Sequence, residues 1–297
     1  MSLVRSHGLK ICSKNLKDCN ATEKYYGRLC LNSIVVLEDE KYMKMLDISN
    51  EAATELSKHF LVPTVEIPEF KDNLKNVFDK SISMECKQKY KFLAIKSFSF
   101  SGDDSKKLSI MANIYKLISQ EKSILDHWQS SSEWTIIIKI WANVFETLFE
   151  DTMIELIWGD TKNDPFKIDL RLCVVVDKKK HDVSNTEFKK NGNRSERKKD
   201  TAKLLTEGKQ ILNGFIKLHN LDLEESKKKK SMVVQVCGLK ALITEVRLVA
   251  PGCYMPNQFG KTLKYPYDLK SAKLFLEQSL QQLFAYKVCL TVPLADI

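Results

Sequence analysis

The chain has 297 residues, of which 43% are hydrophobic and 29% are charged, and its formal net charge is +9. A chain of this length and composition can bury an adequate core without disulfides or metals, which excludes a collagen-like, coiled-coil, largely disordered or small disulfide-stabilised protein. The basic excess favours a polyanionic partner such as nucleic acid, anionic lipid or an acidic protein, without choosing among them.

The first 129 residues are predicted to form a separate, mainly helical region to which the sequence assigns no function. Helical periodicity is present in residues 50–60 and 106–125. Residues 62–68 are expected to be extended because Pro63 and Pro68 restrict the backbone. This region contains no recognisable catalytic motif.

A second region, 130–297, has clearer signals. The segment from Ser130 to Glu133 has the spacing of a capping box, with a hydroxyl at the N-cap and a carboxylate three residues later. The apolar residues that follow repeat at helical spacing up to Glu150, so we predict one long helix whose packed stripe includes Trp134 and Trp141.

Strands and helices then follow in an order typical of a mixed α/β domain. Strands are predicted over 153–158, 167–176 and 183–189, a helix over 200–219, strands over 232–237, 241–250 and 253–255, and a last helix over 268–286. The core order is therefore αβββαβ, with extra C-terminal strands and a helix.

The compartment is expected to be intracellular, nuclear or cytoplasmic, without membrane association. No segment reaches the roughly 18 consecutive apolar residues that a spanning helix needs, and the N-terminus lacks the apolar stretch of a secretory signal. The eight cysteines are dispersed and form no Cys-x-x-Cys pair, so we expect free thiols.

The basic excess is concentrated in two segments of the second region. Residues 178–209 carry a net charge of +6, and the four lysines of 227–230 bring the sum to +10. Each run is compatible with a solvated loop, with nuclear import or with binding of phosphates. The candidates for contact with nucleic acid are Lys178, Lys179, Lys180, Lys190, Arg194, Arg197, Lys198, Lys199 and Lys203.

A candidate site is predicted on the second and third strands. Asp169 lies in the middle of an apolar strand, where a carboxylate is costly unless it is paired or binds a cation. The triplet Glu187-Phe188-Lys189 places two charges on the same face of the next strand. If the two strands form a hairpin, Asp169 approaches Glu187, and two carboxylates and an ammonium converge.

This set of groups suits metal-assisted hydrolysis of a phosphodiester. Asp169 and Glu187 are hard ligands for Mg²⁺ or Mn²⁺, which neutralises charge on the phosphate and acidifies a bound water. Lys189 can orient or deprotonate that water, or stabilise the phosphate in the transition state.

The triplet alone is weak evidence, because Glu-x-Lys occurs six times in the chain. Its context separates Glu187 from the other five: an amphipathic helix and a strand with an interior Asp precede it, and a basic helix follows. The structural alternative is that Asp169 pairs with Arg171 or Lys167, and Glu187 with Lys189.

The order of elements and these residues resembles the PD-(D/E)XK, or restriction-endonuclease-like, nuclease superfamily over about residues 130–255. The resemblance implies that Asp169 is the first metal-binding acid and that Glu187 and Lys189 are the acid and lysine of the motif. Ile168 stands where many members have proline. Members of the superfamily also retain the fold with an eroded site.

Two further positions follow from the resemblance. Some members add a Glu from the first core helix, for which Glu146 is the best match and Glu150 the second. Others add a Lys or Gln from the second core helix, where Lys203, Lys209 and Gln210 are available.

The chain is also similar to a group of uncharacterised fungal nuclease-like proteins. The similarity rests on Trp141 with Phe145 and Phe149, Trp158-Gly159, the 167–171 strand, Gly238 and the 245–248 strand.

Three functions are consistent with the sequence. The first is a metal-dependent nuclease acting on DNA or RNA. The second is a non-catalytic nucleic-acid-binding module on the same fold, whose affinity falls steeply with salt. The third is an intracellular interaction or effector-like protein in which the lysine runs are solvated.

Overall fold

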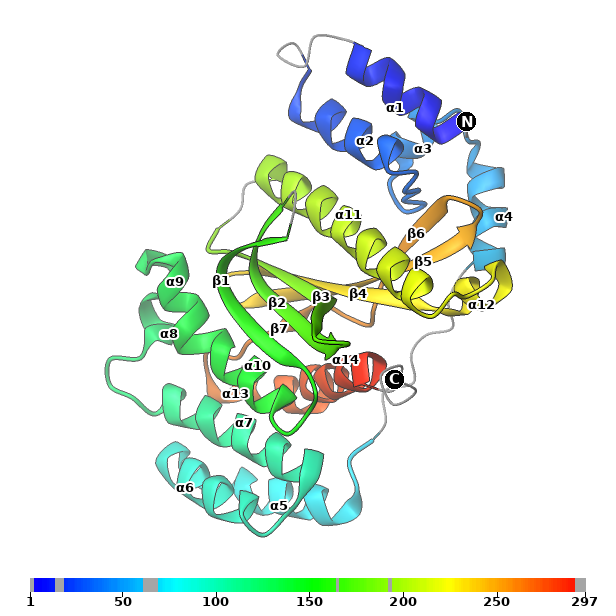
Figure 1. Ribbon diagram of the computed structural model, residues 1–297. Coiled ribbons are helices and arrows are strands. Elements are labelled where there is room, and N and C mark those ends of the chain that lie inside the picture. The colour runs from blue at the N-terminus through cyan, green and yellow to red at the C-terminus, as the bar shows by residue number, and fades with distance from the viewer. Residues whose placement is uncertain (1–2, 14–18, 61–68, 164–165, 192–193, 292–297) are drawn as a thin grey trace.

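The computed structural model describes residues 3–13, 19–60, 69–163, 166–191 and 194–291. It is a mixed α/β structure with a mainly helical N-terminal region and one open mixed sheet (Figure 1). None of the described helices is both long and apolar enough to cross a membrane.

The sheet has the strand order β1-β2-β3-β4-β5-β6, and β7 pairs with β5. The pair β3–β4 is parallel, whereas the other pairs are antiparallel. The strands are β1 (Glu155–Asn163), β2 (Phe166–Val176), β3 (Lys179–Lys189), β4 (Lys230–Cys237), β5 (Lys240–Ala250), β6 (Cys253–Gln258) and β7 (Leu263–Lys264).

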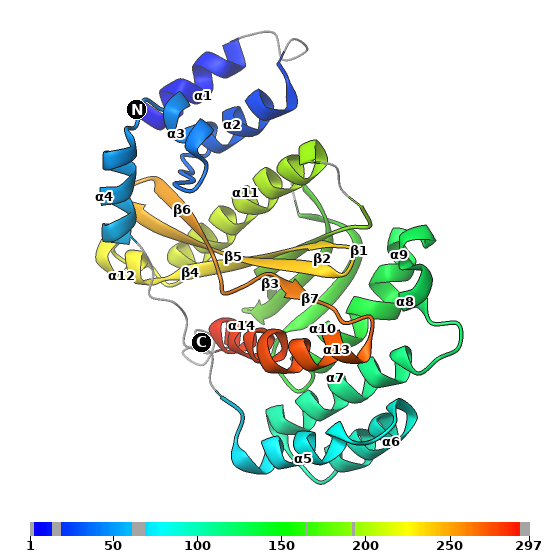
Figure 2. The same cartoon turned by 180° about the vertical axis from the view of Figure 1, so that it is seen from behind.

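Helices cover both faces of the sheet (Figures 1 and 2). The N-terminal helices are α1 (Leu3–Ser13), α2 (Ala21–Leu31), α3 (Glu40–Met45), α4 (Asn50–Phe60), α5 (Asp72–Ile82), α6 (Cys86–Ser97), α7 (Gly102–Ile118), α8 (Ile124–His127) and the short 3₁₀ turn η1 (Trp128–Ser130). The later helical segments are α9 (Glu133–Ile136), η2 (Ile137–Trp141), α10 (Ala142–Phe149), α11 (Arg194–Leu218), α12 (Leu223–Lys228), α13 (Leu269–Leu274), η3 (Phe275–Leu280) and α14 (Gln281–Thr291).

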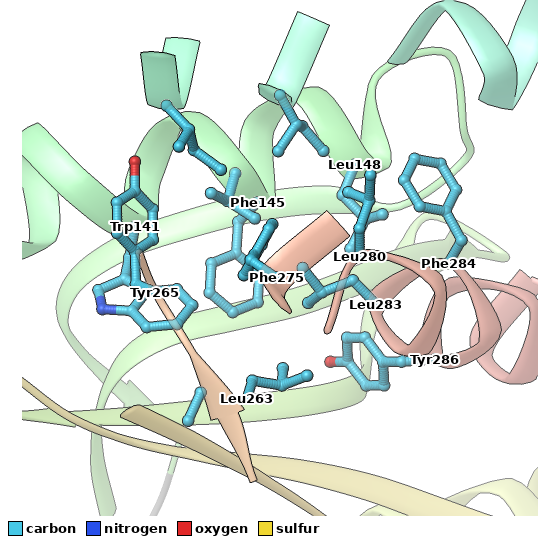
Figure 3. Close-up of a cluster of buried hydrophobic side chains, with 14 of the residues drawn as sticks. Trp141, Phe145, Leu148, Leu263, Tyr265, Phe275, Leu280, Leu283, Phe284 and Tyr286 are labelled. Atoms are coloured by element: carbon cyan, nitrogen blue, oxygen red, sulfur yellow. The ribbon is translucent and has the colours of Figure 1, made fainter. Parts of the chain in front are cut away.

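The larger core lies between the sheet and the helices α10, α13 and α14, as Figure 3 shows for its aromatic centre. Trp141 and Phe145 of this cluster are buried, and the indole Nε1 of Trp141 donates to the carbonyl of Gly238 at 2.8 Å. Helices α5 to α8 contribute to the same core from behind α10.

The smaller core is formed by the N-terminal helices, α11 and the strands β5 and β6. Tyr25, Leu29 and Tyr42 of the N-terminal helices pack there against Leu205 and Leu212 of α11. Both cores therefore include residues from before and after position 130. The predicted boundary at that position remains a prediction.

Most predicted elements are confirmed, with differences at their ends. The helix over 50–60 and the strands over 167–176 and 241–250 are present, and β3 and α11 begin four and six residues earlier than expected. The predicted helix over 106–125 is wrong beyond Ile118, where α7 ends. The predicted extended segment 62–68 lies outside the described residues.

The packed stripe predicted for the helix after Ser130 is only partly correct. Trp141 is fully buried, but Trp134 and Ile138 are 48% and 61% exposed. The segment η2 is a π-helix, and its wider turn shifts the apolar face of α10 relative to that of α9. The N-cap is Ser132 rather than Ser130, and its hydroxyl accepts from Thr135 N.

Gly238 joins β4 to β5 and ties their turn to the end of β3, because its N–H donates to the carbonyl of Lys189 at 2.7 Å. Its φ is +57°, and an added Cβ would lie 2.4 Å from the Trp128 ring. Gly252 has a similar φ of +69° but open space around it.

We therefore expect Gly252→Ala to lower the free energy of unfolding by about 1–2 kcal/mol, because alanine is strained in the left-handed backbone conformation. Gly238→Ala adds overpacking against Trp128 and should cost about 1–3 kcal/mol more. Urea unfolding of both variants measures the difference. Equal costs at the two positions would contradict this account of the turn.

Candidate functional site

The hairpin predicted for the two site strands is confirmed, since β2 and β3 pair antiparallel with Leu170 opposite Thr186. Continued by one residue, this register places Asp169 opposite Glu187, so that both side chains lie on the same face of the sheet. The N–H of Phe188 donates to Oδ2 of Asp169 at 2.8 Å, which fixes that carboxylate at the edge of the hairpin.

Strand alternation separates the triplet into two faces. Phe188 is 1% exposed and packs in the larger core, against Phe145 and Trp158. Glu187 and Lys189 point the other way, towards α11, because their ion-pair partners Lys203 and Asp200 belong to that helix. The site therefore lies between β3 and the first half of α11.

Lys203 is a basic partner of the cluster. Its ammonium donates to Oε1 of Glu187 and to the carbonyl of Lys167. It was predicted from the basic run and, by resemblance, from the second core helix. The structure brings it to Glu187 as a largely buried ion pair rather than leaving it on the surface.

Two acids of α11 were not predicted as site residues. Asp200 has its Oδ2 3.9 Å from Nζ of Lys189. Glu207 is buried, and its Oε2 accepts from Nδ2 of Asn185 at 3.3 Å. Their spacing was a usable signal, because positions 200, 203 and 207 share one face of a helix.

Burial and like charge shift the pKa values of these acids. The pKa of Glu187 is raised to about 7, first by burial and then by the charge of Asp169, against the lowering effect of Lys203. Burial raises the pKa of Glu207 to about 8, with Glu187 adding to the shift. Burial also raises the pKa of Asp200.

The pKa of Lys189 is raised, whereas burial alone would lower the pKa of a lysine. Burial lowers its pKa, but the charges of Asp200, Glu133, Asp169 and Glu187 together outweigh burial, and the net pKa lies above the usual value. The side chain is 37% exposed, so this ammonium is held charged and accessible.

The structural alternative paired Glu187 with Lys189, but each of these side chains has an ion-pair partner on α11. Arg171 bonds Oδ1 of Asp182 through Nε at 3.0 Å and Nη2 at 2.6 Å. Glu187 pairs with Lys203, and Lys189 with Asp200. The ion pairs of Glu187 and Lys189 therefore run between β3 and α11, whereas that of Arg171 joins β2 to β3.

The predicted Glu146 lies on α10, which packs on the opposite face of the sheet from α11. Its Oε1 accepts from the indole Nε1 of Trp158 at 2.6 Å. Glu133 of α9 reaches the site end of β3 instead, where its Oε2 accepts from the N–H of Lys190 at 3.0 Å. Sequence reasoning missed Glu133 because it assigned that carboxylate to a capping box.

The candidate phosphate-binding cations fall into two groups. Lys178, Lys179 and Lys180 lie at the turn between β2 and β3, and Lys180 pairs with Glu155 at 2.6 Å. The length of β3 separates this turn from Lys189 by roughly 30 Å. These three candidate lysines therefore lie far from the Glu187–Lys189 end of β3.

The second group lies at the site end of β3 and along the first turns of α11. It contains Lys190, Arg197 and Lys199, together with Lys198, whose Nζ lies 5.4 Å and 5.2 Å from the ring centroids of Tyr25 and Tyr26. Arg194 begins α11, but its side chain lies outside the described residues.

Among the side chains that the structure describes, no three His, Cys, Asp or Glu residues form a group able to hold a metal ion. Asp169 and Glu187 supply two carboxylates. Two are compatible with Mg²⁺, which commonly keeps several waters and takes only one or two protein carboxylates.

Comparison with known proteins gives no relative: no protein-family model, curated protein or solved structure matches the chain. The resemblance to a nuclease superfamily therefore remains a prediction from the sequence.

The raised pKa of Glu207 predicts a pH-dependent stability. Between its usual value of 4.5 and about 8, the unfolded chain ionises this carboxyl while the folded chain keeps the proton. The folded state thus loses stability as pH rises through this window. Glu207→Gln removes this titration. The free energy of unfolding of the variant should therefore rise relative to that of the wild type between pH 5 and pH 8.

Urea unfolding of both proteins at these two pH values measures this effect. If the difference in free energy of unfolding between them does not change with pH, Glu207 does not titrate in this way.

Proposed function

We propose that the chain is a metal-dependent nuclease-like protein that hydrolyses phosphodiester bonds in DNA or RNA. The observation that carries the proposal is the meeting of Asp169 and Glu187 on paired strands, with Lys189 on the same face and within range of both charges. The order α10-β1-β2-β3-α11-α12-β4, with β4 parallel to β3, is compatible with the restriction-endonuclease-like core expected from the sequence, with the short α12 added.

The residues present fit a hard divalent cation. The charge of Asp169 disfavours ionisation of Glu187, and a cation between the two carboxylates would remove that penalty. Asp169 and Glu187 would hold Mg²⁺ or Mn²⁺ through oxygen, the donor that these ions prefer. Bound there, the ion would act as a Lewis acid and supply a water of lowered pKa.

Lys189 is proposed to act as a cation rather than as a base. A lysine must lose its proton to accept another, and the carboxylates around Lys189 raise its pKa. Its ammonium is therefore suited to stabilise negative charge that develops on the phosphate. The N–H of Phe188 has a supporting role, because it orients Asp169.

The second group of cations is the proposed contact for the nucleic acid backbone. Lys190 follows the end of β3, and Arg197 and Lys199 lie in the first turns of α11. Contacts of this kind bind phosphates without reading bases and weaken with salt.

One observation favours the non-catalytic alternative. The ammonium of Lys203 contacts Glu187, so a positive charge already lies on one of the two proposed ligands. A chain that only binds nucleic acid through this face would need no metal.

The test is cleavage of labelled single-stranded DNA, double-stranded DNA and RNA with Mg²⁺ and with EDTA. We expect cleavage that requires the metal and falls at least about 100-fold in Asp169→Asn and Lys189→Met. Glu224→Gln removes one exposed carboxylate of α12 and serves as the control, with unchanged cleavage.

Fluorescence anisotropy at low and high salt separates the two functions. Binding that weakens with salt but never yields product supports the non-catalytic module. Cleavage that survives EDTA, or that is insensitive to Asp169→Asn, would refute the proposed nuclease.

A further inference from the structure

Asp200 lies at the site without a role in the proposed reaction. It is 9% exposed, and its Oδ2 is buried without a hydrogen-bond partner. Nζ of Lys189 lies 3.9 Å from this oxygen, beyond hydrogen-bond distance. A buried carboxylate oxygen in this state is costly, so its position calls for an explanation.

The position of Asp200 is fixed by the neighbouring residue. Thr201 Oγ1 donates to Oε1 of Gln235 at 3.1 Å, and Nε2 of Gln235 donates to the carbonyl of Arg197 at 3.2 Å. Gln235 is the register partner of Glu187 on the parallel strand β4. The first turns of α11 are thus tied to the sheet beside Glu187, with Asp200 between these contacts.

Asp200 also interacts electrostatically with both proposed ligands. Its charge contributes to the raised pKa of Glu187, and the charge of Asp169 contributes to the raised pKa of Asp200. Three carboxylates therefore share one neighbourhood with the ammonium groups of Lys189 and Lys203. Lys203 is engaged by Glu187, which leaves Lys189 near Asp200.

We propose that Asp200 is a third carboxylate ligand of the divalent cation, and that it exchanges its contact with Lys189 for the metal when the metal binds. This inference rests on the proposed function. The described carboxylates do not form a three-ligand group as they stand. The exchange accordingly requires the Asp200 side chain to rotate away from Lys189.

The exchange has a consequence for Lys189. Once Asp200 binds the cation, the ammonium of Lys189 loses its neighbour on α11 and is free to turn to the phosphate of the substrate. The metal and Lys189 thus compete for the carboxylate of Asp200. Removing Asp200 should therefore weaken metal binding, whereas removing the charge of Lys189 should strengthen it.

The experiment titrates the full chain with Mn²⁺ alone and follows the free ion by electron paramagnetic resonance. We expect Asp200→Asn to weaken binding by about tenfold or more, a loss typical of removing a group from a metal site. Lys189→Met should bind Mn²⁺ more tightly than the wild type, because the competing ammonium is gone. Glu224→Gln, which removes an exposed carboxylate, should bind like the wild type.

Asp200→Ser is a second variant, and circular dichroism and melting temperature identify any variant that fails to fold. If both Asp200 variants bind like the wild type while Asp169→Asn and Glu187→Gln lose the metal, Asp200 is not a ligand and the proposed function stands. Weaker binding in Lys189→Met would refute the exchange. Absence of Mn²⁺ binding in the wild type would overturn the inference together with the proposed metal dependence.

Discussion

The parallel pairing of β3 with β4 is the constraint on which the site depends. Two parallel neighbours cannot be joined by a tight turn, so the chain has to cross the sheet, and α11 is that crossing. The helix is thereby laid over the face on which β2 and β3 carry Asp169 and Glu187. The candidate site is part of a helix–sheet contact that also contains apolar side chains such as Leu205 and Val246.

Burial under α11 explains the electrostatics of the cluster. Carboxylates on an exposed hairpin would be screened by water and salt, whereas under a helix they depend on ammonium groups supplied from the same elements. Lys203 supplies one such charge to Glu187, and Lys189 lies near Asp200. The arrangement concentrates negative charge beside Lys189, whose side chain is partly exposed to solvent.

The sequence was sufficient for the hairpin and for which of its faces carries the charges, because a period of two determines which residues share a side. It was not sufficient for Asp200 or Glu133, since contacts between a helix and a strand depend on packing that periodicity does not encode. Trp134 shows a second limit: a π-helical turn changes the exposed face, and the apolar pattern of the helix carries no sign of it. Likewise, the basic residues of 178–209 form one segment of the sequence, although the length of β3 separates Lys178 from Lys190 in the structure.

The irregular pairing of β1 has a consequence for how the sheet ends. β1 is an edge strand, and its register with β2 shifts between Trp158 and Thr161. A bulge of this kind twists an edge away from the flat geometry to which a strand of another chain can add. The edge of the sheet at β1 is therefore a poorer template for an added strand than a regular edge strand would be.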